Sequence, residues 1–169
     1  ETRITYCDPG TDLISLVRRL LPEAARLESA EAEAGDISEG LPLEAPLGYD
    51  GDGVATARLP AGFMRLLYLR MSDWSDGLTQ TVPAAQVPLL RATARRRSGR
   101  RHRGILLRHG GDGRVLDIYG SLPGAVIAEA SYLPRPEIAG DSIFIPSSLV
   151  ERVARRAAAS VRETLTQNN

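Results

Sequence analysis

The most apolar stretch of the chain is residues 60–77, PAGFMRLLYLRMSDWSDG, which contains the single Trp and both Met. Apolar side chains alternate along it in an extended conformation, and Arg65 and Arg70 interrupt the run. This alternation predicts a half-buried strand, because successive side chains of a strand point to opposite faces. The Ser-Asp-Gly sequence at its end indicates a turn. We expect a core made of Phe63, Leu66, Tyr68, Trp74, Tyr119 and Tyr132.

Two helices are predicted, one toward each end of the chain. Thr11 or Asp12 can cap a first helix, whose apolar positions keep helical spacing. Pro22 either kinks this helix or starts a second one as its first residue. The last helix follows Pro146 and carries one apolar stripe, with arginines outside the stripe.

Between the helices the pattern changes to short extended runs separated by turn residues. Residues 54–59 predict a short strand, and residues 104–107 and 114–119 flank a Gly-rich turn that indicates a β-hairpin. Residues 125–133 alternate again and end at prolines. Residues 35–53 have no periodicity and are rich in Gly, Pro and acidic residues, so we predict an exposed loop there.

The length and composition indicate an ordinary globular protein. At 169 residues, with 43% hydrophobic and 25% charged residues, the chain is expected to form a single domain, residues 1–169. No apolar run approaches the ~20 residues that cross a bilayer. There is also no basic segment followed by an apolar one, so we expect neither a secretion signal nor a membrane contact.

The charged residues are unevenly distributed, although the net charge is zero. Residues 1–52 carry 12 acidic residues and 4 Arg, whereas residues 91–108 carry 8 Arg and no acidic residue. A chain with an acidic end and a basic segment can pair with copies of itself, or present the basic segment to a polyanion.

The basic segment, residues 91–108, therefore has two interpretations. As a nucleic-acid site it would neutralise phosphates, and binding would be salt-sensitive and independent of sequence. The segment contains no aromatic residue for base stacking. Alternatively, it is an exposed hairpin arm that pairs with the acidic region of a neighbouring copy. The contact residues in either case are Arg91, Arg95, Arg96, Arg97, Arg100, Arg101 and Arg103.

Few residues are candidates for catalysis or metal binding. His102 and His109 lie in or beside the basic segment, where positive charge makes them poor general bases and poor metal ligands. Cys7 has no partner cysteine, and no Gly-rich phosphate loop, GxSxG or HExxH motif is present. Asp112 and Asp117 are better explained by structural roles. We therefore predict no enzyme, no metal site and no cofactor.

An ordered set of short motifs extends over residues 54–165. Residues 60–66 match P-x-x-F-x-R-L, and Trp74 follows shortly after. Residues 116–119 match L-x-x-Y, and residues 130–134 match A-x-Y-x-P ahead of the closing Ala-rich helix. This order resembles the head-to-tail adaptor proteins of tailed bacteriophages, including the ring or neck proteins of crAss-like phages of Bacteroidetes. Those proteins usually have a polar stretch with Gly and Pro before the hairpin, where this chain has its basic segment.

The resemblance implies a virion structural protein that joins the portal to the tail around the DNA channel. It implies a homo-oligomeric, dodecameric ring whose partners are the portal protein, other neck and tail proteins, and the DNA that passes through. Such a protein is made in the host cytoplasm and resides in the neck or tail of the virion. The rival hypothesis is a small bacterial nucleic-acid-binding module that uses the basic segment.

The expected fold is α+β. A small antiparallel β-sheet with an arginine-rich hairpin is expected to pack against the N- and C-terminal helices. Residues 1–35 would form the N-terminal helical part, residues 54–145 would be mostly β, and residues 146–167 would form the C-terminal helix.

Overall fold

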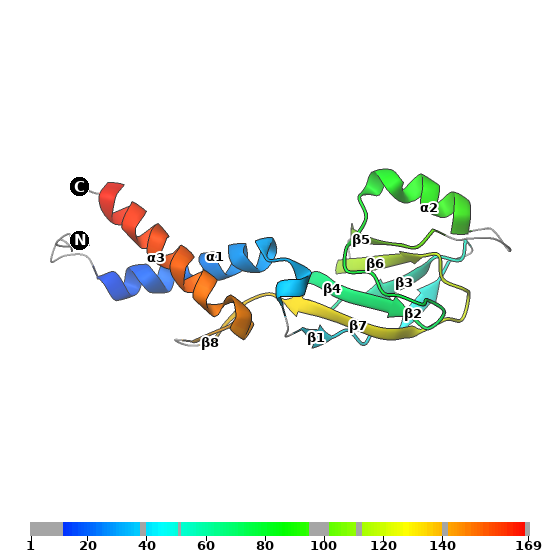
Figure 1. Ribbon diagram of the computed structural model, residues 1–169, viewed down its shortest axis with the longest axis horizontal. Coiled ribbons are helices and arrows are strands. Elements are labelled where there is room, and N and C mark those ends of the chain that lie inside the picture. The colour runs from blue at the N-terminus through cyan, green and yellow to red at the C-terminus, as the bar shows by residue number, and fades with distance from the viewer. Residues whose placement is uncertain are drawn as a thin grey trace. The chain divides into compact units, whose positions relative to one another are not determined.

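The fold is mixed α+β, with antiparallel sheets in the middle of the chain and a helix toward each end (Figure 1). The computed structural model describes residues 12–37, 40–50, 52–94, 102–110, 113–139 and 142–167, which contain three α-helices and nine β-strands. The predicted fold class is confirmed. The contacts divide the chain into two compact units, Gly40–Pro134 and a second that combines Glu1–Glu39 with Arg135–Asn169. The expectation of one domain stays a prediction.

The first helix of the helical unit is α1, Leu13–Glu31. Asp12 is its N-cap, because the Asp12 carboxylate accepts hydrogen bonds from the backbone N–H groups of Ile14 and Ser15 at 3.1 and 3.3 Å. Hydrogen bonding, first from the Ser15 side chain, lowers the pKa of Asp12. Pro22 lies inside the helix, which continues past it. Asp12 is thus confirmed as the cap. Because α1 continues through Pro22, the alternative that a second helix starts there is wrong, and the kink stays a prediction.

The second helix of this unit is α3, Val150–Gln167, which follows the 3-10 turn Ser147–Leu149. α1 and α3 lie side by side (Figure 1). They run antiparallel, since Glu28 near the end of α1 pairs with Arg152 near the start of α3. The unit also holds the 3-10 turn Ala34–Asp36 and a hairpin of β8, Glu137–Ala139, and β9, Ser142–Phe144. Its buried apolar side chains include Leu16, Ala24, Ala25, Leu149, Val153, Ala157 and Val161.

The β unit contains two antiparallel sheets. In the first sheet the order is β1-β7-β4, formed by Leu41–Pro42, Ile127–Pro134 and Phe63–Met71. In the second sheet the order is β2-β3-β6-β5, formed by Leu47–Tyr49, Ala55–Arg58, Gly113–Tyr119 and Gly104–Gly110.

Side chains from both sheets form one core cluster. β4 contributes Phe63, Leu66 and Leu69, and β6 contributes Leu116 and Ile118, all of them buried. A helix of this unit, α2 (Val87–Ala94), follows the 3-10 turn Ala84–Gln86. A smaller buried cluster of Leu90 from α2, Tyr119 from β6 and Val54 attaches this helix to the second sheet.

The strand predictions are confirmed, and the loop prediction is wrong. Residues 54–59 contain β3, residues 104–107 and 114–119 lie in the paired strands β5 and β6, and residues 125–133 contain most of β7. The apolar stretch forms β4, the longest strand described, as its alternation predicted. Residues 35–53, predicted as an exposed loop, instead contain a 3-10 turn and the strands β1 and β2. These strands have only two and three residues, so their sequence is too short to show alternation. They exist because β7 and β3 supply pairing partners.

Candidate functional site

The seven arginines expected to make contacts are only partly described. Arg91 lies in α2, and Arg103 directly precedes β5. The other five, Arg95, Arg96, Arg97, Arg100 and Arg101, lie outside the described residues. The structure therefore shows how the basic segment contacts the β unit on either side of residues 95–101.

At the first end, Arg91 is exposed on α2 and faces an acidic turn. Its guanidinium Nη1 lies 3.8 Å from the Asp52 carboxylate, and the two side chains are 52% and 29% exposed. The turn is closed by Asp50, whose Oδ1 accepts hydrogen bonds from the backbone N–H of Asp52 and of Val54. Asp50 thus builds a turn, a common role of Asp side chains, which hydrogen-bond to backbone groups a few residues further on.

At the second end, Arg103 covers the only Trp of the chain. Its guanidinium carbon lies 5.5 Å from the centroid of the Trp74 ring, and it reaches the Ser75 hydroxyl at 3.5 Å. A cation over an indole face is attracted by the ring's negative electrostatic potential. Trp74 is only 4% exposed, so Arg103 attaches this part of the basic segment to a buried side chain of the β unit.

The next arginine along the chain has a structural role. Arg108 on β5 pairs with the carboxylate of Asp117 on β6, and the Asp117 side chain is 4% exposed. This hydrogen bonding is the main reason that the pKa of Arg108 is raised. The structural role expected for Asp117 is therefore observed, and Asp112 lies outside the described residues. His102 and His109 are both exposed beside this hairpin.

The residues expected in the core are mostly buried. Phe63, Trp74 and Tyr119 are at most 4% exposed, and Leu66 and Tyr132 are at most 9% exposed. Tyr68 is only half-buried. Its ring lies against Gly77, where a Cβ atom would approach the ring to 2.2 Å. Gly77 therefore permits the close approach of the turn to β4.

Two of the sequence motifs lie on neighbouring strands. β4 and β7 pair so that Phe63 is opposite Pro134 and Leu66 is opposite Tyr132. The rings of Phe63 and Tyr132 stack with centroids 5.5 Å apart and planes at 22°. The motifs P-x-x-F-x-R-L and A-x-Y-x-P thus form one continuous structural element. Arg114, on the strand of the L-x-x-Y motif, donates a hydrogen bond to the Phe63 carbonyl at 2.6 Å.

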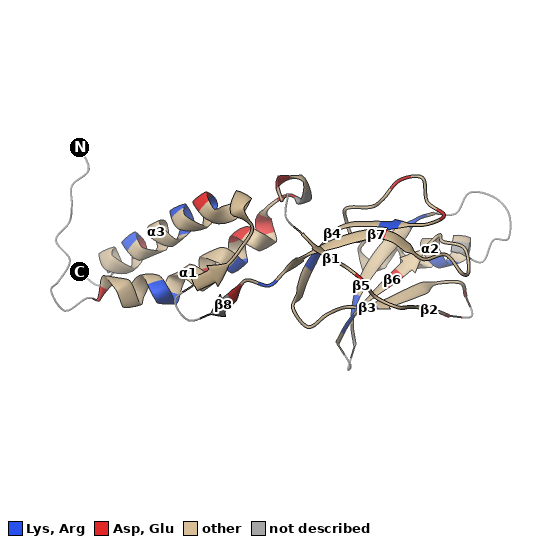
Figure 2. Cartoon of the chain, turned by 90° about the horizontal axis from the view of Figure 1, so that it is seen from below, with Lys and Arg blue, Asp and Glu red and all other residues tan. Residues whose placement is uncertain are grey.

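A cluster of charged residues joins α1 to α3, and the sequence analysis did not identify it. Glu28 is 7% exposed and accepts hydrogen bonds from Arg152 and Arg156. Glu31, which is more exposed, pairs with Arg156, and the exposed Asp36 pairs with Arg152. The pKa of Glu28 is lowered, chiefly by the hydrogen bond from Arg156. Figure 2 shows the basic and acidic residues along the two helices.

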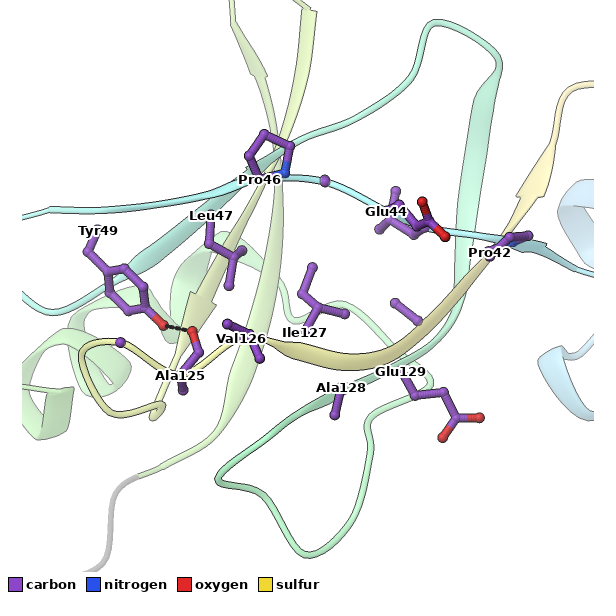
Figure 3. A pocket seen from close by; sticks show the side chains of 14 residues that line it. Pro42, Glu44, Pro46, Leu47, Tyr49, Ala125, Val126, Ile127, Ala128 and Glu129 are labelled. Carbon is purple, nitrogen blue, oxygen red and sulfur yellow. Dashed lines mark hydrogen bonds between the residues drawn. The ribbon is translucent and has the colours of Figure 1, made fainter.

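A groove of about 830 Å³ lies in the β unit between residues 42–49 and residues 124–130. Figure 3 shows Leu47, Val126 and Ile127 among its lining side chains. The Tyr49 hydroxyl donates a hydrogen bond to the carbonyl of Ala125 across the groove. Burial is the main reason that the pKa of Tyr49 is raised.

The described residues hold no group of three or more His, Cys, Asp or Glu side chains placed to bind a metal ion. No helix in this part of the chain has the length and apolar character needed to span a membrane. Comparison with models of known protein families and with curated protein sequences finds no match. Any assignment of function therefore depends on the residues themselves and on the motifs they form.

Proposed function

We propose that this protein is a virion structural protein, a subunit of the head-to-tail adaptor ring that joins the portal of a tailed phage to its tail. The observation that carries the proposal is the arrangement of the adaptor-like motifs. Phe63 on β4 and Tyr132 on β7 stack on adjacent strands. Motifs separated by about 70 residues in the sequence thus contribute to one structural element, and this supports the proposal that they belong to one fold.

Exposed apolar side chains on α1 also support an assembling protein. Leu13, Ile14 and Val17 are 45%, 65% and 37% exposed within the first two turns of the helix. A group of large apolar side chains at the surface usually marks a protein–protein contact. In the proposed ring, this part of α1 would contact a neighbouring protein.

The charge distribution fits contacts between unlike surfaces. Residues 1–52 are strongly acidic and residues 91–108 strongly basic. When one surface of a subunit binds a different surface of the next copy, the contact repeats and closes into a ring if the rotation allows. Arg91 and Arg103 fix the ends of the basic segment on the β unit, so in the proposal this segment meets a neighbouring subunit or the DNA in the channel.

The competing proposal is a nucleic-acid-binding module, favoured by eight arginines without an acidic residue over residues 91–108. It predicts DNA affinity that falls steeply with salt concentration. The adaptor proposal predicts instead that the segment is needed for incorporation into particles.

The triple variant R95A/R96A/R97A distinguishes the two functions. Its DNA affinity would be measured by fluorescence anisotropy over a salt series, and its incorporation by complementing a phage that lacks the gene. Unchanged DNA affinity with failed incorporation supports the adaptor. Lost DNA affinity with normal incorporation contradicts the proposed role of the segment in the ring. The control R155A/R162A removes two exposed arginines of α3, and we expect it to change DNA affinity little.

A further inference from the structure

Strand β7 is covered differently along its two edges. On one edge it pairs with β4 over most of its length, from Ile127 to Pro134. On the other edge, within the described residues, β1 pairs with Ser131 and Tyr132. One further hydrogen bond follows, from the backbone N–H of Leu43 to the carbonyl of Ala130 at 2.9 Å. Among the residues that the structure describes, none pairs as a strand with the β1 edge of β7 from Ile127 to Glu129.

The reason lies in the segment that follows β1. After Leu43 the chain leaves the first sheet, and residues 47–49 form β2, which pairs with β3 of the second sheet. Pro46 has no N–H group and cannot donate to a neighbouring strand. The chain from Leu43 to Tyr49 therefore separates from β7, and the groove opens between them.

The groove is closed at both ends by hydrogen bonds. One is the bond between Leu43 and Ala130, and the other joins the Tyr49 hydroxyl to the carbonyl of Ala125. Between Ala125 and Ala130 an extended chain spans about 16 Å, at about 3.3 Å per residue. This length and the volume of about 830 Å³ suit an extended segment of four to five residues.

The lining combines apolar surface with negative charge. Val126 is 59% exposed, and alanines at several lining positions leave space beside Leu47 and Ile127 (Figure 3). Two lining residues, Glu44 and Glu129, are acidic, and no lining residue is basic. Arg70 lies outside the lining and reaches the Glu129 carboxylate at 3.7 Å, with Glu129 still 63% exposed.

We propose that this groove binds an extended peptide segment of a partner protein, which adds as a strand along the open edge of β7. Open strand edges present backbone groups that pair readily with another strand, and pockets for alternate side chains then give specificity. The apolar lining selects apolar side chains at alternate positions of the segment. Glu44, on the 42–49 side of the groove, selects an arginine or lysine beside it, whereas Glu129 points away from Ile127 and Leu47 (Figure 3) and pairs with Arg70. This inference is independent of the proposed ring function.

The first test uses a displayed library of random hexapeptides, selected on the full-length protein. We expect enrichment of sequences with apolar residues at alternate positions and at least one basic residue. Absence of enrichment over a mock selection, or enrichment of acidic sequences, would overturn the proposal. The most enriched peptide would then be synthesised, and its dissociation constant measured by isothermal titration calorimetry.

Charge selection is tested with Glu44→Arg. Because Glu44 is exposed, loss of one charge pair weakens binding by up to about fivefold, and the reversed charge adds a repulsion, so we expect the basic peptide to bind at least about fivefold more weakly. The matched control Glu163→Arg makes the same charge change on exposed α3 and should leave the dissociation constant unchanged. Equal effects of the two substitutions would show that the peptide responds only to net charge, which contradicts the proposed site.

Strand addition and location are tested separately. N-methylation is placed in turn at two adjacent central peptide residues, because only alternate N–H groups of an added strand face β7. At one of the two positions the loss of a backbone donor should weaken binding by up to about tenfold. Val126→Asp places a charge in the groove at a position exposed enough to leave the fold intact, which circular dichroism would verify. Binding that survives both changes would show that the peptide binds elsewhere.

Discussion

The strongest prediction concerns Glu28, the buried carboxylate between α1 and α3. Its side chain is 9% exposed, and Arg152 donates to it at 2.8 Å, while Arg156 donates to the other carboxylate oxygen. Glu28→Gln keeps the size and shape of the side chain and removes its charge. One arginine then faces the amide N–H2 group and loses its acceptor, and the other keeps only an uncharged acceptor, so we expect the free energy of unfolding to fall.

The magnitude follows from the exposure of the partners. A hydrogen bond to a charged group contributes about 1.5–3 kcal/mol, so two such bonds set an upper limit of about 6 kcal/mol. Arg152 is 41% and Arg156 31% exposed, so water can replace much of what the carboxylate provided. Glutamine also keeps one acceptor oxygen. We therefore expect a loss of about 2 kcal/mol, well below the limit.

Urea denaturation followed by far-ultraviolet circular dichroism measures this loss. The matched control is Glu23→Gln, because Glu23 pairs with Arg26 on the same helix while both side chains are more than half exposed. Exposed ion pairs contribute little, so the control should match the wild type within error. The reasoning is refuted if both substitutions lower the unfolding free energy equally.

Three further predictions follow from the same structure. The pKa of Glu28 in the folded state lies below its usual value of 4.5. The contribution of Glu28 to the unfolding free energy is therefore present above pH 4.5 and is lost as the pH falls through the folded-state pKa. The difference in stability between wild type and Glu28→Gln should thus shrink in acid unfolding curves. Ser29 is 0% exposed and its hydroxyl has no hydrogen-bond partner among the described residues. Ser29→Ala should therefore raise the unfolding free energy by about 1 kcal/mol. A lower unfolding free energy in urea denaturation would contradict this. Arg103→Ala uncovers the Trp74 ring, so the neutral quencher acrylamide should quench its fluorescence more strongly than in the wild type. Equal quenching would show that Arg103 does not shield the ring.

Local patterns predicted the elements that depend on local sequence. The alternation of residues 60–77 identified β4, and the Asp12 cap marked the start of α1. Both features need only the preferences of neighbouring residues. Pro22 shows the limit of this reasoning, because α1 continues through it while packed along α3.

Features that depend on distant pairing could not be predicted in the same way. β1 exists because Leu41 lies opposite Tyr132, about 90 residues later in the chain. The groove begins where the pairing of β1 with β7 ends, after Leu43, and no pattern in the local sequence predicts this position. Glu28 did carry a readable signal, since Arg152 and Arg156 are four residues apart and therefore lie on one face of a helix.

The role of the exposed start of α1 in assembly can be tested with a substitution. Ile14→Glu places a charge on a side chain that is 65% exposed and should leave the fold unchanged. In the proposed ring it would prevent incorporation into particles, whereas Ala154→Glu, at an exposed position of α3, serves as the control. If the Ile14→Glu variant is incorporated normally, the start of α1 is not a contact surface in the ring.

The most direct test of the account is quantitative mass spectrometry of density-purified phage particles from the source host. The adaptor proposal predicts that this chain is present in the particles, in a ratio to the portal protein that matches a ring of neck subunits. Its absence from purified particles, together with abundant protein in the soluble lysate, would contradict the proposal.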